Sequence, residues 1–176
     1  MVACLAVVLC SCAFSGFATG PRRVRFDESE FAAYRGSGSG TVTGQLDIKA
    51  NGSEHVGNFG SSIAGIHVTL IPVTPYTEEM VEREIGDGVY LGGSDLRFKK
   101  YVRLTQTDPN GYFIFHEVPA GEYFVSGLGE WIEYGRFNYQ WACERVMIDA
   151  GQTIKIRLMH NLHHPGKRTL VIWALE

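Results

Sequence analysis

The sequence has no large excess of charge of either sign. Its 16 basic and 19 acidic side chains leave a formal net charge of -3 over 176 residues. A protein that holds a phosphate backbone needs a strong positive field, and this chain has none of the required size. We therefore expect no nucleic acid among its partners. The composition, 45% hydrophobic and 20% charged, is that of one ordinary globular domain.

Cysteine is also scarce in the body of the chain. Three of the four cysteines lie within the first 12 residues, and the fourth is Cys143. If Cys4 and Cys10 are removed with a signal peptide and Cys12 carries lipid, no internal disulfide can form. The core must then hold without a covalent cross-link. Cys143 lies in an apparent strand, so we predict a small buried core residue rather than a nucleophile paired with a histidine.

Catalytic and phosphate-binding motifs are missing as well. There is no G-x-S-x-G string and no phosphate-cradling loop. His116 could pair with Asp108, Glu117, Glu122 or Glu130, but the first three carboxylates lie in turn signals and none accompanies a nucleophile motif. The sequence therefore predicts no catalytic residue, no cofactor and no enzyme activity.

What the N-terminus does contain is a stretch without a charged side chain, residues 1–18, in which Val2, Leu5, Val7, Val8 and Leu9 make a short apolar run. It is too short to cross a bilayer comfortably as a mature helix and is typical of an export signal. Within it, Leu9-Cys10-Ser11-Cys12 resembles the lipobox of bacterial lipoproteins, which implies a signal peptide over 1–11 and a lipid on Cys12. The alternative is a plain secretory signal cut near Ala18, which would make the protein secreted.

The resemblance to lipoproteins implies a location in the cell envelope. A multiply acylated cysteine anchors stably, so the membrane is an expected partner through the lipid. Ala13 after the anchor is not acidic, which by resemblance to lipoprotein sorting suggests the outer membrane. Residues 12–39 are predicted to be a lipid anchor and flexible tether, because Gly and Ser alternate over 36–40. One or two helical turns capped by Asp27 are expected within it.

From residue 40 onward the pattern is that of an all-β domain. Alternating polar and apolar residues, bounded by Gly, Pro, Asn and Asp, predict seven or eight short strands, the signature of a sandwich. These strands are expected at 41–49, 67–71, 101–107, 112–118, 123–125, 143–148, 153–159 and 169–174.

Two connections between these strands have distinctive signals. The turn signal over 108–111 predicts a hairpin between the strands at 101–107 and 112–118. The longest insertion, 74–100, is predicted to contain a short helix, Glu78–Ile85, capped by Thr77 and ended by Gly86.

Several strings resemble one domain family. Thr107-Asp108-Pro109-Asn110-Gly111-Tyr112-Phe113-Ile114-Phe115, with the turn Pro119-Ala120-Gly121-Glu122-Tyr123, resembles the signature of carboxypeptidase regulatory-like domains. Gly40-Thr41-Val42-Thr43-Gly44 resembles the family's opening strand. The likeness covers 40–159 and implies a transthyretin-like, or prealbumin-like, β-sandwich over 40–176. Domains of this family are non-catalytic appendages, which implies a structural or binding role by analogy of fold.

A closer resemblance is to uncharacterised bacterial lipoproteins that carry such a domain. It rests on Pro72-Val73-Thr74-Pro75-Tyr76-Thr77, which opens the insertion, and on Lys100-Tyr101-Val102-Arg103 after it. Our first hypothesis for the function is accordingly a structural or protein-interaction module of the envelope, with a protein partner there.

Aromatic residues are concentrated in one stretch, which is the main candidate for a binding surface. It is interpreted as a loop over 131–141 that could stack on sugars or anchor a partner protein, so glycan binding is the alternative function. The same rings could instead seal the end of the sandwich. The residues are Trp131, Tyr134, Phe137, Tyr139 and Trp141.

The string His160-x-x-His163-His164 is the nearest approach to a metal cluster. Neutral imidazoles bind zinc and copper, so a metal-dependent enzyme is the least favoured hypothesis. Three histidines with no obvious fourth ligand are more often a solvated polar turn, and no metal is predicted.

Overall fold

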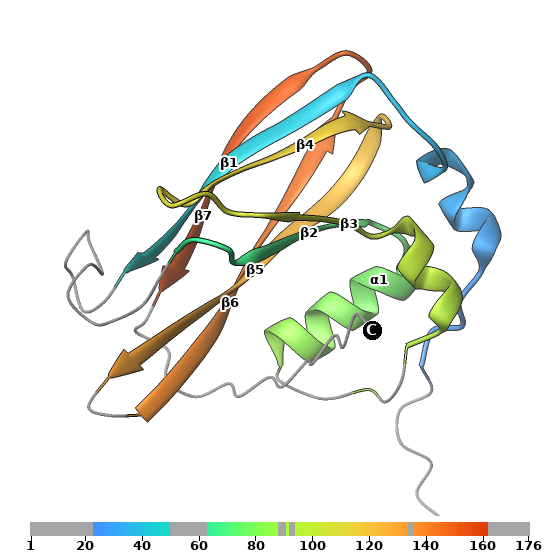
Figure 1. Cartoon of the computed structure of the whole chain (residues 1–176). Helices are drawn as coiled ribbons and strands as arrows, with labels where there is room; N and C mark the ends of the chain where they lie inside the picture. The colour runs from blue at the N-terminus through green and yellow to red at the C-terminus, as the bar shows by residue number, and fades with distance from the viewer. Residues whose placement is uncertain (1–22, 50–62, 88–90, 92–93, 134–135, 162–176) are drawn as a thin grey trace, which may run out of the picture.

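The computed structural model describes residues 23–49, 63–87, 91, 94–133 and 136–161. Within them, seven strands form two sheets, which confirms the predicted all-β sandwich (Figure 1). The strands are β1 (Gly40–Lys49), β2 (His67–Pro72), β3 (Arg103–Gln106), β4 (Tyr112–Val118), β5 (Gly121–Glu133), β6 (Arg136–Ile148) and β7 (Thr153–Asn161). The further strand predicted at 169–174 lies outside the described residues, as does Cys12.

The two sheets differ in size and in strand direction. One has the order β4-β1-β7, in which β1 runs antiparallel to β4 and parallel to β7. The other has the order β3-β2-β5-β6 and is antiparallel throughout. Strands β5 and β6 are adjacent along the chain and pair from Gly121↔Ile148 to Glu133↔Arg136.

The main core lies between the sheets and is built from alternate residues of the strands. Phe113 and Phe115 of β4 point into it, as their alternation with Tyr112, Ile114 and His116 predicted. They pack with inward residues of the other strands, among them Val42, Leu46, Val68, Leu70, Tyr123, Val125, Ala142, Ile148 and Leu158.

The predicted hairpin over 101–118 is wrong. Strand β3 pairs with β2 and strand β4 pairs with β1, so the turn between them carries the chain from one sheet to the other. The turn chemistry itself is as expected, because the Asp108 carboxylate accepts bonds from the backbone N–H of Asn110 and Tyr112, and Gly111 has φ +80°. The same turn geometry suits a hairpin or a connection between two sheets. Here β4 pairs with β1 and buries Phe113 and Phe115 in the main core, so the turn connects the two sheets.

The insertion before β3 is mostly helical. Helix α1 (Pro75–Met80) continues as the π-helical turn η2 (Val81–Gly86), and the 3-10 helix η3 (Leu96–Tyr101) precedes β3. The predicted end at Gly86 is confirmed.

The predicted cap of this helix is wrong. Thr74, not Thr77, is the N-cap, and its hydroxyl accepts a bond from the Thr77 backbone N–H. Thr77 is the third residue of the helix and completes a capping box, because its side chain accepts a hydrogen bond from the Thr74 backbone N–H at 2.9 Å. The cap lies three residues earlier than predicted because Pro75 is well suited to the first helical position.

A second hydrophobic cluster, here called the outer cluster, lies on the other face of the four-stranded sheet. Ile71 of β2 and Phe124 of β5 point into it from the sheet. The insertion and the N-terminal segment supply the rest, which Figure 1 shows as helices on one side of the sheet. The other buried members are Phe26, Phe31, Tyr76, Met80, Val81, Phe98 and Tyr101.

Residues 23–39, here called the strap, are part of the folded body. The predicted cap is confirmed, because Asp27 begins the 3-10 helix η1 (Glu28–Tyr34) and accepts the Ser29 backbone N–H. Phe31 of this helix is fully buried in the outer cluster. The flexible tether predicted over 12–39 is therefore wrong from residue 23 onward, and residues 12–22 lie outside the described part.

Two of the three glycines that favoured a tether, Gly38 and Gly40, are packed closely instead. The Gly38 N–H donates to the Glu117 carbonyl at 2.8 Å, and a Cβ on Gly38 would lie 2.3 Å from the Cα of Pro119. Tyr34 packs edge-on against Tyr123 and donates its hydroxyl to the Val73 carbonyl. Glycine here permits contact between two backbones, which is a different use from flexibility.

None of the helices in the described part of the chain is long and apolar enough to span a bilayer.

Candidate functional site

The aromatic stretch predicted as a loop is the end of the β5–β6 hairpin. Trp131 pairs with Asn138, and Trp141 pairs with Leu128, in the antiparallel register. The expected loop is therefore wrong, because the hydrogen-bonded ladder continues to Glu133↔Arg136. Tyr134 lies outside the described residues. The described part also leaves out the side chains of Trp131, Phe137 and Tyr139.

Trp141 is the one member of this set whose side chain is described. It is half-buried, and its indole Nε1 is buried without a hydrogen-bond partner in the described part of the protein. Ligand binding by this stretch stays a prediction, as does the alternative that its rings close the sandwich.

The weak metal candidates are not brought together in the described residues. His160 is near the end of β7 with its side chain undescribed, and His163 and His164 lie outside the described part. Across residues 23–161, less the gaps noted above, no group of three or more His, Cys, Asp or Glu side chains is arranged to hold a metal ion.

Cys143, Glu122 and Asp108 are held in structural roles. Burial raises the pKa of the Cys143 thiol to about 12, so the thiol stays protonated at neutral pH. The Glu122 carboxylate pairs with Arg145, and Asp108 binds the backbone of its own turn. His116 is exposed on β4.

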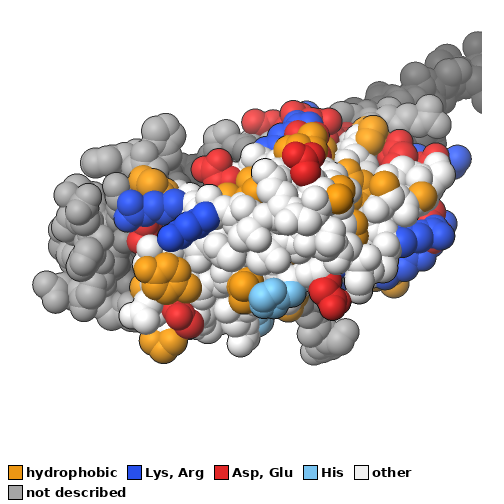
Figure 2. Space-filling model, turned by 90° about the horizontal axis from the view of Figure 1, so that it is seen from above, with side chains coloured by type: hydrophobic (Ala, Val, Ile, Leu, Met, Phe, Trp, Pro, Cys, Tyr) orange, Lys and Arg blue, Asp and Glu red, His pale blue; other side chains and the backbone are white. Residues whose placement is uncertain are grey.

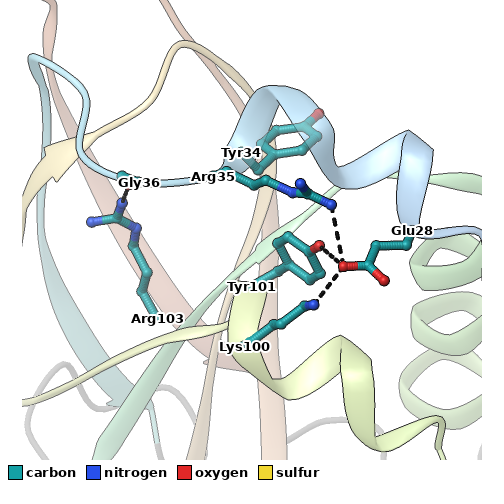
Figure 3. A pocket seen from close by; sticks show the side chains of 7 residues that line it. All are labelled: Glu28, Tyr34, Arg35, Gly36, Lys100, Tyr101 and Arg103. Atoms are coloured by element: carbon teal, nitrogen blue, oxygen red, sulfur yellow. Dashed lines mark hydrogen bonds and ion pairs between the residues drawn. The ribbon is translucent and has the colours of Figure 1, made fainter.

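A cleft of about 460 Å³ lies where the strap meets the end of η3 and the start of β3. Figure 3 shows its side chains converging from these separate segments. The lining residues are Glu28, Tyr34, Arg35, Gly36, Lys100, Tyr101 and Arg103. Sequence reasoning found none of these as site residues.

One carboxylate oxygen organises the cleft. Oε1 of Glu28 accepts bonds from Lys100 Nζ at 2.5 Å, from the Tyr101 hydroxyl at 3.0 Å and from Arg35 at 3.2 Å. The bond from Lys100, followed by that from Tyr101, holds the pKa of Glu28 below its ordinary value, so the carboxylate is ionised at neutral pH. All three bonds reach Oε1, and Oε2 receives none from the described residues (Figure 3).

Arg103 has a structural role in the cleft, because it binds two backbone carbonyls. Its guanidinium donates to the Gly36 carbonyl at 2.6 Å and to the His116 carbonyl at 3.3 Å. It thereby ties the end of the strap to β4 from a position on β3. Lys100 and Tyr101 are placed by η3, whose start is capped by Asp95.

The cleft is suited to binding polar groups. It presents an ionised carboxylate and two exposed cations, which can form hydrogen bonds with polar groups of a ligand. None of the seven lining residues is a Ser, Cys or His.

The sequence did not predict the cleft, because the residues that line it lie in segments interpreted as a tether and as an insertion. Arg35 precedes the glycines interpreted as a tether, and Lys100 ends the insertion. The only signal was the Lys100–Arg103 string, which entered as a resemblance and not as a site. Glu28 and Lys100 are 72 residues apart, so no local pattern joins them.

The chain matches no protein-family model, and the search of curated proteins found no match. The resemblance to carboxypeptidase regulatory-like domains is thus not confirmed, although the β-sandwich that it implied is. Among solved structures, the chain is similar to a protein of Pseudomonas aeruginosa described provisionally as carbohydrate binding. The identity is 26% and the TM-score 0.64, over 79% of this chain and 100% of that one.

Two pilin proteins are more distantly similar. The major pilin subunit of Bacillus cereus shows 14% identity and a TM-score of 0.40, over 70% of this chain and 30% of its own. The minor pilin of Streptococcus agalactiae shows 17% and 0.36, over 70% and 44%. The protein of Pseudomonas aeruginosa is compatible with a non-catalytic binding module.

Proposed function

We propose that this chain is a non-catalytic carbohydrate-binding module whose site is the cleft between the strap and η3. The observation that carries the proposal is the 26% identity, over the whole length of the neighbour, to a protein described provisionally as carbohydrate binding. This favours the second of the functions predicted from the sequence. The protein partner predicted first stays a prediction.

The chemistry of the cleft supports the proposal. Its volume of about 460 Å³ lies within the range of small-molecule sites. Sugar hydroxyls both donate and accept hydrogen bonds, and Oε2 of Glu28 can accept while Arg35 and Lys100 donate. Because Glu28 is held by three donors, its carboxylate is oriented before a ligand arrives, which reduces the ordering cost of binding.

The proposal is tested by screening the purified protein on a glycan array and titrating the best ligand by calorimetry. Glu28→Gln is expected to weaken that ligand about tenfold, since it removes a charged hydrogen-bond acceptor. Glu82→Gln is the matched control, because Glu82 is an exposed carboxylate on η2 outside the cleft. Absence of binding to any glycan would overturn the proposal.

The aromatic hairpin is the rival site for the same function. Trp131→Ala and Trp141→Ala should leave the affinity unchanged if the cleft is the site. Loss of binding in these variants, with Glu28→Gln unaffected, would move the site to the end of β5 and β6.

We also propose that the module is held in the bacterial cell envelope by a lipid on Cys12, at the outer membrane. The lipobox-like string Leu9–Cys12 supports this. Mass spectrometry of the protein purified from native membranes should find an acylated Cys12 at the new N-terminus. A soluble, unacylated chain beginning near residue 19 would instead support the secretory alternative.

A further inference from the structure

Positive charge exceeds negative charge in the cleft, although the whole chain has a formal net charge of -3. Arg35, Lys100 and Arg103 line it from three different segments, against the single carboxylate of Glu28. Arg103 is used by the backbone carbonyls that it binds. Arg103 nevertheless keeps its charge, so the lining has two positive charges in excess, and Arg35 and Lys100 are the exposed cations that can face a ligand.

Both exposed cations have donors to spare. The Lys100 ammonium has three N–H groups and the Arg35 guanidinium has five, and each uses one on Glu28. Their side chains are 53% and 59% exposed, so these donors can reach a ligand in the cleft. Figure 3 shows Arg35 above and Lys100 below the Tyr101 hydroxyl, all three reaching the Glu28 carboxylate.

We propose that the carbohydrate bound in the cleft is acidic, and that a sugar carboxylate bridges Arg35 and Lys100 beside Glu28. This rests on the proposed function and narrows it to the uronate class. A carboxylate supplies negative charge where the lining has an excess of positive charge. Its two oxygens can accept one bond from each cation, and such charge-assisted bonds are the stronger kind.

Glu28 has a positioning role in this arrangement. Its Oε1 accepts a bond from Lys100 Nζ at 2.5 Å and from Arg35 at 3.2 Å and so holds both cations at the cleft, and its Oε2 remains to accept a sugar hydroxyl.

The experiment compares one uronic acid oligosaccharide with its methyl ester, which has the same shape without the charge. Calorimetric titration of the full chain should show that esterification weakens binding about fivefold, the upper range for an exposed ion pair. Lys100→Gln and Arg35→Gln should each weaken the acid by a similar factor and weaken the ester less, so that the advantage of the acid over the ester shrinks. Lys155→Gln, an exposed lysine on β7 in the other sheet, is the charge-matched control and should change neither.

The outcomes separate this inference from the function on which it rests. Equal binding of acid and ester would overturn the acidic specificity and leave carbohydrate binding standing. A phosphorylated oligosaccharide that binds at least tenfold tighter than the uronate, in a manner lost in Lys100→Gln, would overturn the assignment to a carboxylate. No binding of any glycan would overturn both. Far-ultraviolet circular dichroism and thermal melting establish that each variant is folded, and the ester arm needs no variant.

Discussion

The two outer faces of this sandwich are treated differently, although both sheets share one core. The face of the β3-β2-β5-β6 sheet is covered by the strap, α1 with η2, and η3, which bury the outer cluster against it. The face of the β4-β1-β7 sheet has no such cover among the described residues. Tyr112 and Ile114 of β4 are 47% and 42% exposed there, and Met159 of β7 is 44% exposed.

Figure 2 shows the molecule from above the view of Figure 1, where β1, β4 and β7 lie uppermost. Hydrophobic and charged side chains are scattered over this view, and no single patch of either kind dominates it. Such a mixed surface is ordinary for a solvated sheet. The difference teaches that the site depends on the covering layer, because the cleft exists only where the strap docks beside η3.

The largest expected effect comes from removing a side chain that joins the strap to the covered face. Phe31→Ala should lower the free energy of unfolding by about 3 kcal/mol or more, because the ring is fully buried among other aromatic rings. Denaturant unfolding measures it. Ile114→Ala on the bare face is the control and should cost less than about 1 kcal/mol. Equal losses would mean that the two faces do not differ as described.

A smaller loss is expected where the strap backbone touches the body. Gly38→Ala places a Cβ 2.3 Å from Pro119 Cα, so the strap must shift, at a cost of about 1–3 kcal/mol. Hydrogen exchange should show faster exchange of the strap amides, whereas strands β1 and β7 stay protected. Ser39→Ala, which is exposed one residue later, should leave both measurements unchanged. Unaltered strap protection in Gly38→Ala would count against tight docking.

The cap of the covering helix sharpens the comparison further. Thr74→Ala removes the N-cap of α1, and the free energy of unfolding should fall by about 1 kcal/mol. Thr153→Ala on the bare sheet is an exposed threonine without a capping role and should have an effect within about 0.5 kcal/mol. Thermal unfolding of both variants checks this. If Thr74→Ala matched the control, the cap would not contribute to stability.

The smallest effect is electrostatic and belongs to the cleft. The pKa of Glu28 is depressed in the folded state, chiefly by its bond from Lys100. The carboxylate therefore stabilises the fold above its unfolded pKa, and this contribution is lost as pH falls through the lower, folded value. A carbon-13 titration should place the Glu28 midpoint below the ordinary glutamate value. In Lys100→Gln the midpoint should move back up, and a midpoint that does not move would show that Lys100 is not the cause.

Much of the sandwich was predictable because strand period and turn chemistry are local. Phe113 and Phe115 were expected on the buried face, and both are in the main core. The turn at Gly111 was expected and is present. The hairpin that was inferred from it is absent, because β4 pairs with β1 and not with β3. A turn specifies that the chain reverses and leaves open which strand it pairs with next.

The site was much less predictable for the same reason. Asp27 was correctly expected to cap a helical turn, because its hydrogen-bond partner is the backbone N–H of Ser29, two residues away. The interpretation of residues 36–40 as a tether failed because glycine permits close packing as readily as flexibility, and composition does not distinguish them. The contact of Val24 with Glu79 spans 55 residues, and no local signal announces it.

By itself, the sequence determined that this chain forms an all-β domain, where most of its strands lie and which side chains of β4 face inward, because these depend on neighbours two to four residues away. Only the tertiary structure decided that β3 and β4 belong to different sheets and that the strap covers one face. It also decided that Glu28 meets Lys100 in a cleft. Those outcomes depend on which distant surfaces bury each other, and that free energy exists only in the assembled fold.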